Sequence, residues 1–290
     1  MRIYDFDTED EFIKIEMNLN NVKLLKNSIA DYASEYRKFS RDINVDFRVL
    51  GDCIESYERA LLIGVYTYAE QLVKNFYYEL LEKDRTQCIS INQFVGTKLD
   101  IEKFSPNVKY NELENSIKKE LVPDFQFLIK KDRDEILKYN DIIKDRHRYA
   151  HRGIYQSSIE QYKDVINAEK FITIELAMVV EKGVEYRIRY QNDWKEIINL
   201  SKKCYGLYKQ FKEKKHKQIK KQLTLKTKVL RNKSKQLYNK YDEYIDNCGL
   251  LEGVKAQLLR INSMDLRMLA SFSILEDFDK AISDGKMLKG

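Results

Sequence analysis

Residues that break helices are scarce in this chain. Its 290 residues include only 2 prolines and 10 glycines, whereas a sheet-rich fold needs frequent turns. Hydrophobic residues make up 43% of the chain, enough for a core, and charged residues make up 34%, as expected for the outer faces of helices. The sequence therefore predicts an all-α fold, a helical bundle that is one large domain or one domain with an extension.

Apolar residues recur at helical spacing over several segments before residue 184. The stretch 52–82 has the broadest apolar band, which is typical of a core helix in a bundle. A helix that starts near Phe125 either breaks near Asp132 or continues into the segment that ends at Gly153, where glycine fits the position after the last turn. Further helices are expected over 20–39, over 111–121, and from Ser157 or Ser158 to about Gly183.

Other segments carry weaker or different signals. Residues 83–110 are expected to be irregular, with a short extended piece at Cys88–Ile91. The stretch 184–190 alternates and is a candidate strand, after which helices resume at Trp194. Asn247–Gly249 reads as a stop before a final helical region over 251–282. We expect two parts, residues 1–183 as the bundle and 184–290 as a helical C-terminal extension.

Cysteine usage and hydropathy indicate a reduced, cytoplasmic environment. The four cysteines lie far apart and form no CxxC pair, so free thiols are expected rather than a zinc ribbon. The first residues soon turn acidic and lack the apolar core of a secretory signal. A run of about 18 apolar residues, as a membrane span needs, does not occur in the sequence.

One segment concentrates groups that suit phosphate or proton chemistry. The motif segment, residues 146–153, reads Arg-His-Arg-Tyr-Ala-His-Arg-Gly and holds two of the three histidines. Histidine titrates close to neutrality, and arginine forms bidentate contacts with phosphate oxygens. A pair of imidazoles beside guanidinium groups suits metal-free RNA cleavage, in which imidazole moves protons and arginine stabilises the charge of the transition state.

Helix geometry constrains how these groups can meet. His147 and His151 are four residues apart and share a helix face. Arg146 and His151 are five apart, about 140° around the axis at 100° per residue. They converge on one atom only where the helix ends, or when a second copy of the helix supplies part of the site. A two-fold dimer therefore fits the spacing better than a monomer.

Two other interpretations of the motif segment stay open on residue types alone. His147 and His151 could bind zinc, although Arg148 and the missing glutamate separate this pattern from HExxH, and three arginines are unfavourable beside a dication. The cluster could also simply decorate the C-terminal end of a helix, where cations are favoured by the helix dipole.

The stretch Ile142–Gly153, which includes the motif segment, resembles the hallmark of the HEPN superfamily. That hallmark is an arginine followed by a histidine after four to six intervening residues, the first usually polar, and Arg146, His147 and His151 match it in turn. The sequence is similar to HEPN proteins found beside RiboL-PSP-type and other prokaryotic defence genes. The resemblance is specific around the motif and extends over about residues 15–183 by helix order.

The resemblance implies a helical bundle with metal-independent endoribonuclease activity and no cofactor. It also implies a homodimer with a composite cleft, used in toxin–antitoxin or phage-defence systems. Arg146 and His151 would be the catalytic pair, and His147 the polar residue that assists or orients. Some HEPN toxins carry a tyrosine two residues after the histidine, where this chain has Gly153, with Tyr155 two further on.

The positive charge is concentrated in one segment. Residues 202–240 contain 15 Lys/Arg and one acidic residue, Glu213, for a charge of +14, whereas the rest of the chain has 37 basic and 45 acidic residues. A phosphate-binding arm that holds RNA by its backbone is one interpretation. A solvated helix reflecting an AT-rich genome, and docking to an acidic antitoxin or a second protomer, are the alternatives. The candidate RNA-binding residues are Lys212, Lys214, Lys215, Lys217, Lys220 and Lys221.

The sequence thus favours an RNA-cleaving dimer with a basic helical extension that engages RNA. The alternative, from a different functional class, is a non-catalytic helical module that binds RNA or a partner protein.

Overall fold

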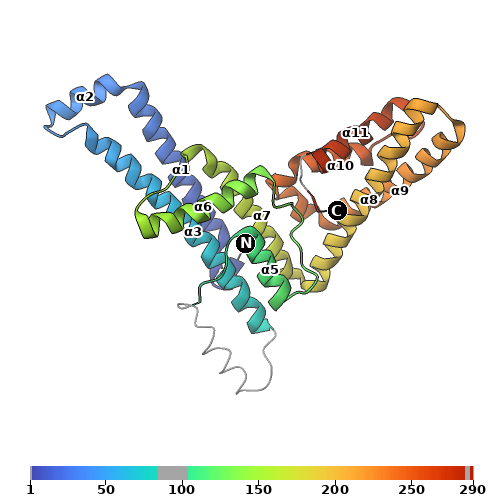
Figure 1. Cartoon of the computed structure of the whole chain (residues 1–290), viewed down its shortest axis with the longest axis horizontal. Helices are drawn as coiled ribbons and strands as arrows, with labels where there is room; N and C mark the ends of the chain where they lie inside the picture. The colour runs from blue at the N-terminus through green and yellow to red at the C-terminus, as the bar shows by residue number, and fades with distance from the viewer. Residues whose placement is uncertain (1, 84–103, 285–287, 290) are drawn as a thin grey trace, which may run out of the picture. The chain divides into compact units, whose positions relative to one another are not determined.

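The protein is all-α. The computed structural model describes residues 2–83, 104–284, 288 and 289, and Figure 1 shows its helices in chain order. Within these residues the one sheet is a small antiparallel hairpin of β1 (Arg2–Ile3) and β2 (Phe6–Asp7). The predicted all-α fold is therefore confirmed. The predicted extended piece at Cys88–Ile91 lies outside the described residues.

The chain forms two compact units that are not consecutive in sequence. The first comprises residues 1–113 and 138–169, and the second comprises residues 114–137 and 170–290. Because compactness describes packing and not which segment functions independently, the proposed division of the chain after Gly183 stays a prediction.

The first unit is built on long helices. They are α1 (Thr8–Asp31), α2 (Ala33–Asp42), α3 (Arg48–Lys83), most of α6 (Asp134–Arg152), the short η1 (Ile159–Gln161), the start of α5 (Tyr110–Glu120) and the first part of α7 (Tyr162–Lys182). Their core includes Leu62, Val65, Phe76, Ile142 and Ile143, each fully buried.

The first helix begins at Thr8, twelve residues before the predicted start at Asn20. The Asp7 carboxylate accepts hydrogen bonds from the backbone N–H groups of Glu9 and Asp10, which caps the helix. Phe12 then begins a buried stripe at steps of three or four. The many acidic residues of this first turn obscured the apolar pattern in the sequence.

The second unit contains a long helical pair and shorter helices that pack on it. Besides most of α5, the start of α6 and the rest of α7, it contains α8 (Val184–Lys214), α9 (Lys217–Asp246), η2 (Gly249–Leu251), α10 (Glu252–Asn262), η3 (Leu269–Ser273), α11 (Ile274–Asp279) and the π-helix η4 (Lys280–Asp284). The predicted stop at Asn247–Gly249 is confirmed, and the predicted final helix over 251–282 is divided into several pieces.

The expectation of a strand over 184–190 is wrong, because α8 starts at Val184. Arg187 is fully buried, and its guanidinium pairs with Glu175 and donates to the Gln126 carbonyl at 2.7 Å. Arg187 is charged, so sequence analysis does not count it among the core residues. Without it, the apolar residues of 184–190 alternate as in a strand, although they belong to a helix.

The expectation of a helix from Phe125 is also wrong. Residues 122–133 are not helical, and α6 begins only at Asp134. Side chains take the place of helical acceptors here: the N–H of Gln126 donates to Gln191, and the N–H of Phe127 donates to Glu114. These acceptors lie on other elements of the second unit, which local sequence patterns do not reveal.

Two expectations from the sequence concern the state of the cysteines and the presence of membrane-spanning segments. Cys53, Cys204 and Cys248 are free thiols, and Cys88 lies outside the described part. Within that part, every helix is too short or too polar to cross a membrane.

Candidate functional site

The motif segment forms the last turns of α6, as predicted. The helix continues to Arg152 and Gly153 follows with φ of +67°, a conformation that favours glycine. The Gly153 N–H donates to the Tyr149 carbonyl at 2.9 Å. Since α6 stays helical through Arg152, Arg146 and His151 keep the roughly 140° separation of a regular helix.

The turn before the motif is fixed by the core of the first unit. Ile142 and Ile143 are fully buried. The Tyr139 hydroxyl donates to the Val108 carbonyl at 2.5 Å, and the Asn140 side chain accepts from the Tyr110 N–H at 3.0 Å. These contacts hold α6 against the segment that precedes α5 and so fix the direction in which the motif side chains leave the helix.

Tyr66 of α3 is the platform on which two motif residues rest. The Arg146 guanidinium carbon lies 4.1 Å from the centre of the Tyr66 ring, a cation–π contact. The His147 ring meets the same tyrosine edge-on, with ring centres 5.6 Å apart. Tyr66 is only 5% exposed, so it is itself held by packing. The structure therefore brings Arg146 and His147 together on one buried ring.

The environment of His147 favours its neutral form. Burial lowers the pKa of the His147 imidazole, and the positive charges of Arg146, Lys109 and His151 lower it further. A neutral imidazole can accept a proton at pH 7. His147 is therefore suited to moving or orienting a proton, and not only to providing positive charge.

His151 lies one turn beyond His147 on the same helix face. Its side chain is exposed, and among the described residues no hydrogen bond or ion pair engages its ring. His151 and Arg146 are both close enough to His147 to affect its charge. The structure thus brings Arg146 and His147 together on Tyr66, and it leaves the side chains of both His147 and His151 exposed.

Asp145 anchors the loop that leaves the motif. Its carboxylate is buried, with 3% of the residue exposed, and accepts from the Gln156 N–H and the Arg148 guanidinium, each at 3.0 Å. The Ser157 hydroxyl donates to the same carboxylate. Arg148 thereby has a structural task in this loop.

Tyr155 ties the same loop to α3. Its hydroxyl donates to the Glu58 carboxylate at 3.3 Å, and its ring meets Tyr149 edge-on. Burial, with the nearby Glu58 charge, raises the pKa of Tyr155 to about 12. The hydroxyl therefore stays protonated at neutral pH and holds the loop, while Arg152 remains exposed without an assigned role.

Sequence reasoning missed Tyr66, Asp145 and Glu58. Asp145 carried a usable signal, because one acid directly before three arginines is a natural anchor for them. Tyr66 and Glu58 carried no such signal, since only the packing of α3 on α6 places them at the motif.

The motif segment has few side chains that could bind a metal ion. Within the described ranges, no three His, Cys, Asp or Glu side chains gather in a way that could hold a metal ion. Asp145, the acidic residue next in sequence to the motif, is occupied by the loop.

The six predicted RNA-binding lysines surround the turn between α8 and α9. Lys212 and Lys214 lie in the last turn of α8, Lys215 is in the left-handed conformation at the turn, and Lys217 begins α9. Lys220 and Lys221 follow on α9, and all six side chains are exposed. Among the described residues, Lys212 alone of the six has an ion pair, with Glu276 at 3.6 Å.

The helices that carry these lysines are joined by a complete buried seam. Apolar residues of α9 lie seven apart in the sequence, at Leu223, Leu230, Leu237 and Tyr244, which is half of a heptad repeat. In the structure the other half is supplied by small polar residues and a tyrosine, so that steps of four and three alternate. The seam positions of α9, all buried, are Leu223, Thr227, Leu230, Ser234, Leu237, Tyr241 and Tyr244.

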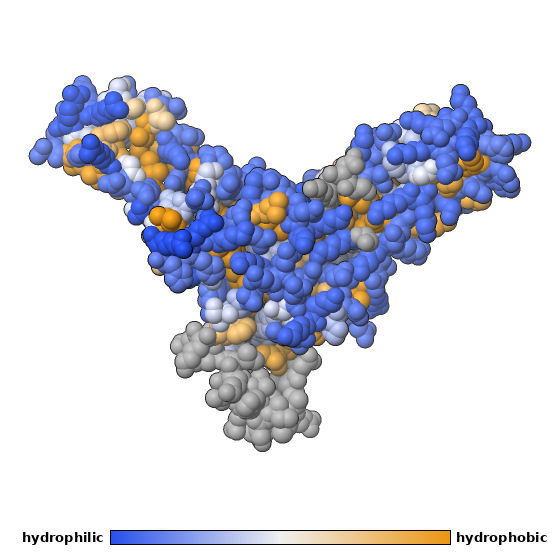
Figure 2. Space-filling view, in the orientation of Figure 1, coloured by the Kyte–Doolittle hydropathy of each residue, from blue (hydrophilic) through white to orange (hydrophobic). Residues whose placement is uncertain are grey.

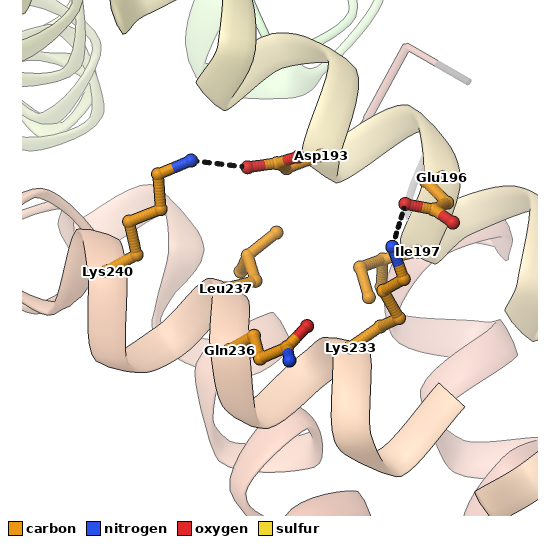
Figure 3. A pocket seen from close by; sticks show the side chains of 7 residues that line it. All are labelled: Asp193, Glu196, Ile197, Lys233, Gln236, Leu237 and Lys240. Atoms are coloured by element: carbon orange, nitrogen blue, oxygen red, sulfur yellow. Dashed lines mark hydrogen bonds and ion pairs between the residues drawn. The ribbon is translucent and has the colours of Figure 1, made fainter. Parts of the chain in front are cut away.

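Two ion pairs strengthen the same helix pair further along. Figure 3 shows Lys240 with Asp193, at 3.0 Å, and Lys233 with Glu196, at 2.9 Å, on either side of a small hollow over Leu237. These two lysines are neutralised within the chain. Of the six lysines around the turn, by contrast, only Lys212 has an ion pair among the described residues.

Comparisons of the chain with protein-family models, with curated proteins and with solved structures gave no match.

Proposed function

We propose that this chain is a metal-independent endoribonuclease of the HEPN type. The observation that carries the proposal is the cluster at the end of α6, where Tyr66 holds Arg146 and His147 together and His151 stands exposed one turn away. Arginine and imidazole groups held together by packing are what phosphate chemistry without a metal requires.

In the proposed reaction a ribose 2′-oxygen attacks the adjacent phosphorus and the bond to the 5′-oxygen breaks. One imidazole takes the proton of the 2′-hydroxyl, and a protonated imidazole gives a proton to the departing 5′-oxygen. Arg146 stabilises the charge that develops on the phosphoryl oxygens. The products are a 2′,3′-cyclic phosphate and a 5′-hydroxyl, and no oxidant, metal or cofactor takes part.

We assign Arg146 and His151 as the catalytic pair and His147 as the group that assists or orients. Because a regular helix separates Arg146 from His151 by about 140°, a homodimer that joins two motif segments in one cleft supports this assignment best. A cytoplasmic toxin–antitoxin or phage-defence setting, with an antitoxin or defence partner, follows from the family resemblance.

The lysines around the α8–α9 turn are proposed to hold the RNA backbone. Lysines in the last turn of α8 are explained by the helix dipole, but those at the start of α9 are not, because cations are unfavourable at a helix N-terminus. The first turn of α9 contains no acidic residue to offset them. A bound polyanion would relieve this repulsion, which supports RNA as the partner.

The second candidate function is a non-catalytic module that binds RNA or a partner protein. The same divergence of Arg146 and His151 favours it, because one copy alone does not direct both groups at a single atom.

Incubation of the purified protein with labelled RNA in EDTA distinguishes the two candidates. The ribonuclease proposal predicts cleavage in EDTA as well as in magnesium. RNA that is bound but left intact in both buffers, at every protein concentration, would favour the binding module.

A further inference from the structure

One part of the first unit has almost no core of its own. The arm, residues 23–60, includes the end of α1, all of α2 and the start of α3. The structure describes every residue of this range, and only Ser40 is buried. Elsewhere in the unit, helices of similar length bury an apolar stripe, as helices in water need to do.

Several large apolar residues of the arm face water, whereas others, such as Leu25, Ile29 and Ile54, are half-buried. Phe39 lies in α2, and Tyr32 and Ile43 flank the two ends of that helix; they are 58%, 58% and 49% exposed. Tyr57, on the following helix, is 60% exposed. Figure 2 shows hydrophobic residues gathered at the surface over this part of the chain.

The exposed apolar area is of the size that an interface uses. Seven large apolar side chains of the arm are 42% to 68% exposed. Summed over the whole arm, these side chains leave on the order of 800 Å² in contact with water. Each partner of a standard interface contributes about 800 Å².

The net charge of the arm indicates which kind of partner it can bind. Residues 23–60 contain seven basic and seven acidic residues, so the arm has no net charge. A polyanion such as RNA, or an anionic membrane, gains no net attraction from such a surface. Two identical arms with balanced charges do not repel each other, and the same patch on both copies can pair around a two-fold axis.

We infer that the arm is the interface between two copies of this chain, which pair arm to arm to form a helical bundle. Two helical hairpins together can enclose the apolar core that each lacks alone. The inference rests on the burial and charge of residues 23–60, and it deepens the proposed homodimer by naming the surface through which two copies pair.

Sedimentation velocity over a range of protein concentrations tests the pairing. The wild type is expected to dimerise, and the double variant with Phe39→Ser and Tyr57→Ser is expected to raise the dimer dissociation constant by on the order of 100-fold. Both side chains are more than half exposed, so the fold of one copy should survive, which circular dichroism checks. The matched control replaces Val229 and Leu259 by serine, since they are 47% and 39% exposed outside the arm.

Amide hydrogen exchange provides the second measurement. Amides of residues 23–60 should exchange more slowly as protein concentration rises, while those of α9 should not change. A wild type that stays monomeric at its solubility limit, or a dimer unaffected by the arm substitutions, would overturn the inference. So would arm protection that appears only with phosphatidylcholine vesicles. A monomer that cleaves RNA would refute both arm pairing and the composite cleft, and would leave metal-independent cleavage itself standing. A dimer that pairs through the arm but leaves RNA intact would refute the ribonuclease proposal and leave arm pairing standing.

Discussion

Two cationic regions of this chain are built in opposite ways. At the end of α6, Arg146 and His147 rest on a buried tyrosine, and Asp145 anchors the loop beside them. Around the α8–α9 turn, the six lysines project into water from helices whose seam is complete without them. Held groups suit chemistry, which needs fixed positions, whereas mobile point charges suit sequence-independent attraction to phosphates. The two regions should therefore fail in different ways.

The largest effect is expected from His151→Ala. Loss of one imidazole that moves a proton should lower the single-turnover cleavage rate by about 10² to 10⁴-fold, while RNA affinity changes little because the lysines remain. Rapid-quench kinetics and filter binding on one RNA measure both quantities. Lys144→Ala is the control, since Lys144 is exposed on the same helix. Equal cleavage by His151→Ala and the wild type would remove the motif from the chemistry.

The opposite failure is expected when lysines of α9 are neutralised. Replacement of Lys217, Lys220 and Lys221 by glutamine should weaken RNA binding on the order of tenfold and reduce the slope of log affinity against log salt by about 2. The rate of cleavage at saturating RNA should not change. The control replaces Lys118, Lys119 and Lys131, which are exposed and remove the same charge elsewhere. If both triple variants bind alike, the lysines around the turn have no special role.

Substitution of Tyr66 should have a smaller effect, because this residue positions Arg146 and His147 and takes no part in the reaction itself. Tyr66→Leu removes the ring under Arg146 and His147, and a cation–π contact contributes about 0.5–2 kcal/mol, so kcat should fall between about twofold and 30-fold. Tyr66→Phe keeps the ring and should restore most of the rate with KM unchanged. A phenylalanine variant as slow as the leucine variant would show that the platform argument is wrong.

Asp145, which anchors the loop after the motif, should contribute to the free energy of unfolding. Asp145→Asn places an amide nitrogen among groups that donate hydrogen bonds, so the free energy of unfolding should fall by about 1–3 kcal/mol. Urea denaturation measures it. Asp141→Asn is the control, because Asp141 is exposed and one turn earlier. A stable Asp145→Asn variant would mean that the loop is held by Tyr155 alone.

The smallest expected effect is the titration of His147. Burial first, and then Arg146, Lys109 and His151, lower its pKa, so NMR should place its midpoint below the ordinary value of about 6.5. Its contribution to stability is complete above about pH 6.5 and is lost as the pH falls through the lowered pKa. Lys109→Gln should move the midpoint upward, and Lys119→Gln should not. A midpoint above 6.5 would contradict the proposed environment.

Features that depend on local residue order could be predicted from the sequence, whereas features that depend on packing between helices could not. The α6 motif and the helix end at Gly153 were predictable because they depend on local residue order. The seam of α9 was half visible because Leu223 and Leu230 are apolar, whereas Thr227 and Ser234 occupy core positions that polarity conceals. These polar residues become core only through the partner helix.

Contacts between distant segments could not be predicted. Tyr66 reaches Arg146 across 80 residues of chain, and Arg187 is buried because Glu175 and the Gln126 carbonyl receive it. A single sequence gives residue type and spacing, and neither states which helix will pack against which. The candidate catalytic residues were thus found from sequence, while what holds them in place was not.

The central claim, cleavage by the ribose 2′-oxygen, is tested most directly with a chemically altered substrate. An RNA that the protein cuts at a known position is resynthesised with one 2′-deoxy sugar at that position, and both RNAs are incubated with protein in EDTA. We expect that the single substitution abolishes the cut, and that the unaltered RNA yields a 2′,3′-cyclic phosphate and a 5′-hydroxyl. Cleavage that persists at the 2′-deoxy position, or products that carry a 3′-hydroxyl and a 5′-phosphate, would contradict it.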